Sequence, residues 1–155
     1  MNRKILLGLV SAATAASMLA MPVFANEAAT ELTTRIESTY TLEIPANNGI
    51  VAGTESTVIG EVSVTGKVLA TDAVTVTAET EAFKNQTQPE ADDLPFALNQ
   101  SNGESFTSAA WSGSEINAAT PKGIELIVDI TPAQWEAAAA GSYVGSITFT
   151  ASMND

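Results

Sequence analysis

The chain has 155 residues with a formal net charge of −12, and it contains neither cysteine nor histidine. These absences exclude disulfides, zinc–thiolate sites, and the Ser-His-Asp and Cys-His arrangements of nucleophilic catalysis. The acidic balance argues against nucleic acid and anionic membrane surfaces as partners, because both would repel the chain.

The first 25 residues have the pattern of a secretory signal peptide. Arg3 and Lys4 give a positive start, an uncharged apolar run follows, and small side chains at Val23 and Ala25 suit cleavage after Ala25. We therefore expect residues 1–25 to be removed, without membrane insertion of the remainder. Removing 25 of 155 residues leaves 130, enough for one domain, and the loss of two cations takes the net charge to −14.

The predicted mature chain begins with a polar, alanine-rich leader over residues 26–33, followed by a domain over residues 34–153. Apolar residues then fall on even positions from Leu32 to Ile44, which predicts a strand with one buried face. That run is long for one strand, so we expect a bulge near Glu37 or a switch between two sheets.

Further period-two alternation predicts strands with intervening turns and loops. Turns are expected at Gly66-Lys67 and at Asn102-Gly103, an exposed loop over 84–93, and a loose stretch over 112–122. The predicted strands cover residues 58–64, 74–78, 94–98, 106–111, 124–130 and 143–151.

One short helix is predicted before the last strand. Thr131 and Gln134 form a capping box, Pro132 suits the first turn, and Gly141 is placed to end the helix. Two turns are too short to be stable alone, so Trp135 is expected to anchor the helix against a sheet edge.

About seven short strands without a βαβ rhythm predict a single antiparallel β-sandwich of Ig-like type, with a closed barrel as the alternative. The expected core comprises Tyr40, Leu42, Ile44, Val62, Val64, Val74, Val76, Phe96, Leu126, Val128, Trp135, Tyr143, Ile147 and Phe149.

Both ends of the predicted domain carry a resemblance. Ala140-Gly-Ser-Tyr-Val-Gly-Ser-Ile-Thr-Phe149 resembles the ending of small exported β-sandwich proteins of Gram-positive bacteria, including pilin-like and spore-coat-like sandwiches. Tyr40-Thr-Leu-Glu-Ile-Pro45 is similar to the first strand of such surface proteins. The WxL surface proteins are a neighbouring family, but Trp111 and Trp135 are followed by Ser-Gly and Glu-Ala, so their motif is absent. The resemblance implies an extracellular, non-catalytic structural or adhesive subunit.

Two candidate ligand sites stand out, and no cofactor is expected. The acidic cluster Glu90, Asp92 and Asp93, with Asn99 nearby, offers the oxygen ligands that calcium prefers; the alternative is a solvated loop. Trp111 has small neighbours that would leave its ring open to stack on a neutral glycan; the alternative is packing in the core.

A third candidate is an assembly strand. If Leu32 and Ile36 do not pair within their own domain, this segment is able to add to the open sheet edge of a neighbour. The alternative is an ordinary first strand with a frayed start.

These observations predict an exported, non-catalytic structural or adhesive protein of the bacterial cell surface or extracellular space. Its expected partners are other surface proteins or copies of itself. The alternative function is a soluble extracellular module that binds glycan or calcium.

Overall fold

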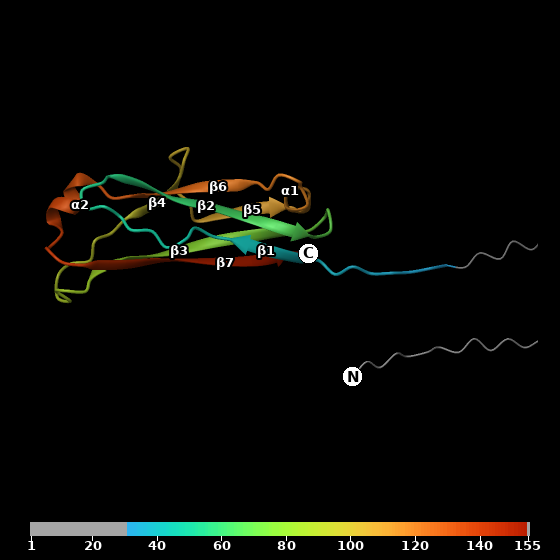
Figure 1. Cartoon of the computed structure of the whole chain (residues 1–155), viewed down its shortest axis with the longest axis horizontal. Coiled ribbons are helices and arrows are strands. Elements are labelled where there is room, and N and C mark those ends of the chain that lie inside the picture. The colour runs from blue at the N-terminus through green and yellow to red at the C-terminus, as the bar shows by residue number, and fades with distance from the viewer. Residues whose placement is uncertain (1–30, 155) are drawn as a thin grey trace, which may run out of the picture. The chain divides into compact units, whose positions relative to one another are not determined.

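Seven strands within the described residues, 31–154, form two antiparallel sheets, so the predicted all-β sandwich is the fold of the computed structural model (Figure 1). The chain divides after Thr34 into two units, and the sandwich lies in the second, which starts at Arg35. The predicted signal peptide, 1–25, and residues 26–30 of the predicted leader lie outside the described residues.

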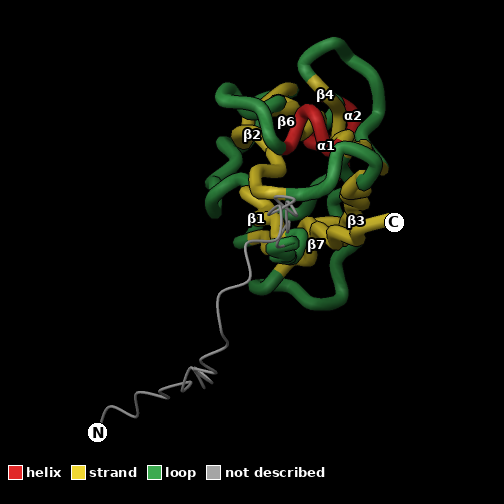
Figure 2. Tube along the Cα trace, turned by 90° about the vertical axis from the view of Figure 1, so that its right-hand side faces the viewer, coloured by secondary structure: helices red, strands yellow, loops and turns green. Residues whose placement is uncertain are grey.

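The two sheets, A and B, are viewed along their strands in Figure 2. Sheet A has the order β1-β2-β6-β4, with bounds Thr39–Glu43, Ser56–Lys67, Gly123–Asp129 and Ala97–Gln100. Sheet B has the order β5-β3-β7, with bounds Ser108–Ser112, Ala73–Asn85 and Tyr143–Asn154. The edge strands β1 and β7 lie on the same side of the sandwich, where the Tyr40 hydroxyl donates to the Ala151 carbonyl at 3.3 Å.

The core lies between the central strands of the two sheets. Val62 and Val64 of β2 and Val74 and Val76 of β3 are fully buried, as alternation predicted. Seven further buried hydrophobic residues are absent from the expected core: Val68, Leu94, Leu98, Phe106, Trp111, Ile116 and Ile130.

Two short helices interrupt the strands, one more than the sequence predicted. The predicted helix is α2, Pro132–Ala137, and its Thr131–Gln134 capping box is present, but the C-cap is Ala138 rather than Gly141. The Trp135 indole N–H donates to the Thr54 carbonyl at 3.0 Å and anchors α2 to the loop before β2. The helix that was not predicted is α1, Gly113–Ile116, in the stretch expected to be loose.

The predicted loop over 84–93 begins later than expected. β3 continues to Asn85, whose buried side chain accepts hydrogen bonds from the backbone N–H groups of Thr87 and Gln88. Its amide also donates to the Ala140 carbonyl at 3.3 Å. Asn85 therefore ties the loop that follows β3 to the segment that leads into β7.

The first predicted strand is much shorter than the alternation from Leu32 to Ile44 suggested. β1 begins at Thr39, and residues 31–38 form no strand, so the expected bulge near Glu37 is wrong. The physical reason is that β1 pairs from Thr39 opposite Lys67, the last residue of β2. The segment before Thr39 has no residue of β2 opposite it.

The turn predicted at Gly66-Lys67 is also wrong, because Gly66 lies inside β2 and pairs with Tyr40. A Cβ atom at this position would collide with the backbone carbonyl oxygen of Thr39. Gly66 is therefore required for the close approach of β1 to β2 rather than for a change of direction.

We predict that Gly66→Ala lowers the free energy of unfolding by about 1–3 kcal/mol, the usual cost of forcing an extra methyl group into a packed position. Gly49→Ala is the matched control, because a Cβ at Gly49 has no neighbouring atom within 4 Å. That control should stay within about 0.5 kcal/mol of the parent. Urea unfolding measures both, and equal stability of the two variants would contradict the close-approach explanation.

Candidate functional site

One side of the sandwich is open beyond the end of β1. There the two layers are separated by a groove of about 430 Å³ between the loop after β1 and the first half of β7. Large apolar side chains from both sheets line this groove, among them Ile44, Ile50, Ile59, Phe96, Ile147 and Phe149. A second hollow, of about 280 Å³, lies between the loop at Asp92 and α2 and is smaller.

The groove exposes side chains that the alternation assigns to the core. Ile44 is 53 % exposed, and Phe96, Ile147 and Phe149 are only partly buried. In β7 every second side chain faces sheet A, yet none of them is fully buried. Their counterparts Val74 and Val76 in β3 are fully buried, because β3 has a neighbour on each side whereas β7 is an edge strand. The inward side chains Val74 and Val76 of β3 are therefore fully buried, whereas those of β7 are only partly buried.

The loop after β1 explains why the groove stays open. Pro45, two residues after the end of β1, has no backbone N–H with which to continue the β1–β2 ladder, which ends at Glu43. The loop is then fastened by a side chain, since the Asn48 amide donates to the carbonyls of Ala46 and Ile59. A bulge in β2 beside Gly60, whose φ is +128°, brings the strand against Pro45.

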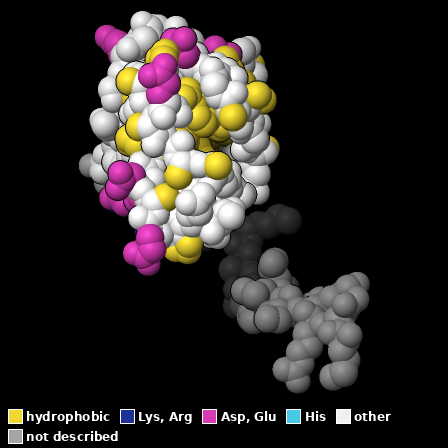
Figure 3. Space-filling model, turned by 90° about the vertical axis from the view of Figure 1, so that its left-hand side faces the viewer, with side chains coloured by type: hydrophobic (Ala, Val, Ile, Leu, Met, Phe, Trp, Pro, Cys, Tyr) yellow, Lys and Arg dark blue, Asp and Glu magenta, His cyan; other side chains and the backbone are white. Residues whose placement is uncertain are grey.

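The floor of the groove is aromatic and its walls carry no charge. The rings of Phe83 and Phe96 lie 5.1 Å apart at a 52° tilt, and no acidic or basic residue is among those lining the groove. Figure 3 views the sandwich from the end that carries α2. Hydrophobic side chains gather in the middle of that face, and acidic side chains lie around its margin.

The first half of β7, Tyr143–Phe149, adds a second feature to the groove and is called the open half of β7 below. β7 pairs with β3 along one edge only, and no strand among the described residues pairs with its other edge. An unpaired edge presents backbone N–H and C=O groups to any extended chain that lies beside it. The site therefore combines an apolar groove with an unpaired backbone edge, the two features that strand addition uses.

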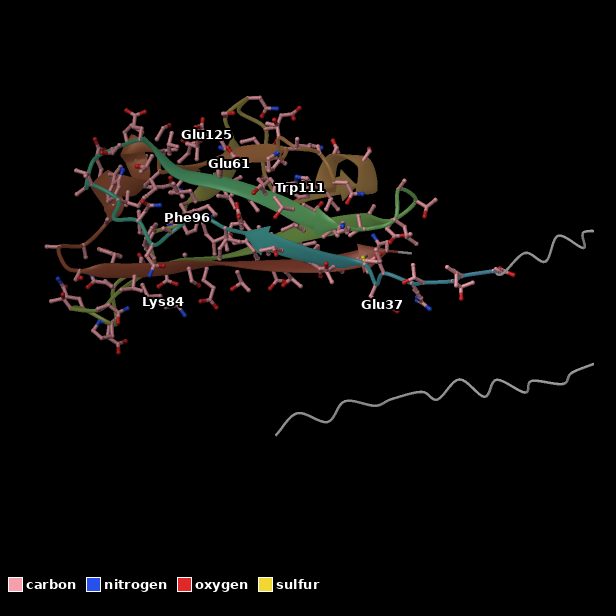
Figure 4. All side chains as sticks on the ribbon, turned by 45° about the vertical axis from the view of Figure 1, so that its right-hand side comes forward. Glu37, Glu61, Lys84, Phe96, Trp111 and Glu125 are labelled. Carbon is pink, nitrogen blue, oxygen red and sulfur yellow. The ribbon has the colours of Figure 1, made fainter. Side chains whose placement is uncertain are left out.

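Trp111 does not belong to this site, and of its two predicted roles, glycan stacking and core packing, its burial fits core packing. The side chain has 0 % exposure, and its indole N–H donates to the Lys122 carbonyl at 2.7 Å. Lys122 also places its ammonium 5.8 Å from the ring centroid. The small neighbours let the ring pack in the core rather than leaving it open. Figure 4 labels Trp111 and, nearer the α2 end of the sandwich, the groove residue Phe96.

The acidic loop is not assembled into a calcium site. Glu90, Asp92 and Asp93 are exposed, and the described residues contain no group of three acidic side chains arranged to hold a metal ion. Asn99 lies in β4, where its amide donates to the Asp129 carboxylate at 2.6 Å. The solvated-loop alternative thus describes these residues.

Leu32 and Ile36, the predicted assembly strand, are strongly exposed at 90 % and 69 %. Neither lies in a strand of the described chain. The condition under which the sequence predicted an assembly strand, the lack of pairing within the domain, is met for these described residues.

The groove was not predicted from the sequence, although one signal was available. The motif Pro45-Ala-Asn-Asn-Gly49 ends the alternation and indicates a loop, and such a loop cannot cover the neighbouring sheet as a strand would. The sequence does not show how many residues of the β7 edge this loop leaves uncovered.

The sequence matches no protein-family model, and no curated protein is significantly similar to it. Within residues 31–154, no helix has the length and apolar character needed to cross a bilayer.

The only pKa shift that the structure indicates for the described carboxylates lies away from the groove, at Glu115. Hydrogen bonding to Lys122, 2.9 Å away, and then to Ser112 lowers the pKa of the Glu115 carboxyl from about 4.5 to about 2. Because the folded-state pKa lies below the unfolded one, this carboxylate stabilises the fold above about pH 4.5. That contribution is lost as the pH falls toward 2.

We therefore predict that Glu115→Gln lowers Tm at pH 6 and that the difference from the parent shrinks between pH 4.5 and pH 2. Glu136→Gln, which removes an exposed carboxyl of α2, is the control and should show no such convergence. Thermal unfolding followed by circular dichroism across this range provides the test. A Tm difference for Glu115→Gln that is as large at pH 2 as at pH 6 would contradict the assignment.

Proposed function

We propose that this chain is an exported, non-catalytic structural or adhesive protein of the cell surface or extracellular space. It acts by associating with other protein chains, copies of itself included, and the groove is its contact surface. The signal-peptide pattern of residues 1–25 and the resemblance to exported surface sandwiches support the location.

The observation that carries the proposal is the open core beside β7. Burying a large apolar side chain that was exposed to water gains roughly 1.5–3 kcal/mol. Ile44, Phe96, Ile147 and Phe149 are left partly in water although their alternation marks them as inward-facing. A protein chain seated in the groove would complete the burial that the sandwich alone does not achieve.

The charge of the chain fits a contact made in this way. From residue 26 onward, eighteen acidic residues against four basic ones make copies of the chain repel one another at long range. An uncharged groove allows contact without burying a carboxylate, which would cost several kcal/mol. Salt should therefore strengthen the association, because it screens the repulsion and leaves the apolar contact intact.

We predict that the chain from residue 26 onward self-associates as its concentration rises, and more strongly at higher salt. Ile44→Lys places a charge in the groove and should weaken association at least tenfold. Leu69→Lys is the matched control, since Leu69 is 62 % exposed and lies outside the groove. Size-exclusion chromatography with light scattering measures the effect. A chain that is monomeric at every concentration, or equal loss in both variants, would contradict the proposal.

A further inference from the structure

The N-terminal segment, residues 31–38, has the sequence pattern of a half-buried strand but is not in one. Leu32, Thr34, Ile36 and Ser38 share the even positions whose continuation in β1, Tyr40 and Leu42, faces inward. Thr33, Arg35 and Glu37 occupy the opposite face. Leu32 and Ile36 are nevertheless 90 % and 69 % exposed. An amphipathic strand pattern is thus present without a sheet.

The open half of β7 is the opposite case, because it is a sheet edge with which no strand of the described residues pairs. It provides seven residues, Tyr143–Phe149, beside the apolar groove. Seven residues of the N-terminal segment, 32–38, span roughly 23 Å when extended, and the open half of β7 has the same length. The N-terminal segment therefore matches the open half of β7 in length, and its apolar face matches the apolar groove.

We propose that the N-terminal segment of a second copy adds as a strand to the open half of β7, with Leu32 and Ile36 in the groove. This inference rests on the proposed function and names the occupant of the groove. The charges support it, because the groove has no charged lining and the two charged residues that follow Leu32, Arg35 and Glu37, fall on the outward face. No charge would be buried, because Arg35 and Glu37, which form an ion pair at 3.0 Å, would both remain in solvent.

A second copy is a better source of the strand than the same chain. The segment enters β1 at Thr39, and the Tyr40–Ala151 contact places this end of β1 beside the last residues of β7. The groove lies beyond the other end, at Ile44. To reach it, residues 31–38 would have to reverse direction within the segment, which contains no glycine, proline, asparagine or aspartate to form a turn.

Donor and acceptor are different surfaces of each copy, so the contact is heterologous. Each copy that receives a strand still has its own segment to donate, and such an interface continues from copy to copy unless a ring closes. The inferred assembly is a linear polymer of sandwiches joined by strand addition.

The first test places charges on the inward face of the donor. Leu32→Asp with Ile36→Asp should weaken self-association at least tenfold, whereas Thr33→Asp, which adds a charge one position away on the outward face, should preserve it. If Ile44→Lys abolishes association and the double variant does not, strand donation is wrong while the groove remains the contact surface. If neither affects association, the proposed function fails as well.

Mixing separates donor from acceptor. The double Asp variant retains an intact groove, and Ile44→Lys retains an intact segment, so an equimolar mixture should form one-to-one complexes although each variant alone is monomeric. Larger oligomers are not expected, because the one intact segment and the one intact groove in each complex are already bound to each other. A mixture that remains monomeric would overturn the proposal.

The absence of cysteine makes cross-linking a direct test of position. Arg35→Cys and Ser146→Cys introduce thiols at the centres of segment and edge, both on outward faces. The two single variants, carrying tags of different length, should form a mixed disulfide dimer on oxidation when combined. Ser152→Cys, on the same face of β7 but outside its open half, is the control. Equal yields with Ser146→Cys and Ser152→Cys would overturn the assigned position.

Discussion

Burial of apolar side chains between the two sheets is the interaction on which this structure depends, and that burial is uneven. Val62 and Val64 of β2 and Val74 and Val76 of β3 are closed off from water because each strand has a neighbour on both sides. The inward side chains of β7 are less well covered by sheet A, because β1 ends at Glu43. The loop that follows β1 is held by the Asn48 side chain instead of by backbone hydrogen bonds to β2. The same constraint, a first strand cut short by Pro45, creates both the incomplete core and the groove.

Alternation in the sequence predicted most of the strands and their inward faces, because side-chain direction in a strand depends on local geometry. The exceptions are residues 32–38, which form no strand, and Val58, which precedes the bulge in β2 and is exposed. Alternation did not predict which inward side chains are covered, since coverage depends on the length of the facing strand. Ile44 and Phe149 were therefore placed in the core and are partly exposed, whereas Trp111, for which glycan stacking and core packing were both left open, is buried. Gly66 was misread for a related reason, because only the partner strand requires its missing side chain.

The short helix α1 was recoverable from the sequence. Ser112 and Glu115 have the spacing of a capping box, the signal that correctly located α2, and both boxes are formed. The groove was not recoverable in this way, because it arises between segments that are far apart along the chain. The alternation that includes Leu32 and Ile36 can be read from the sequence, and both residues are exposed in the structure. The unpaired edge of β7 that this segment would join is known only from the structure.

Hydrogen–deuterium exchange measured at low and high protein concentration tests the central claim most directly. If the open half of β7 is a sheet edge that a second copy completes, its amides should exchange more slowly as concentration rises. The amides of Val74 and Val76, which lie between two strands, should remain unchanged. Exchange in Tyr143–Phe149 that does not depend on concentration would contradict the account, because the sandwich would then be complete as a single chain.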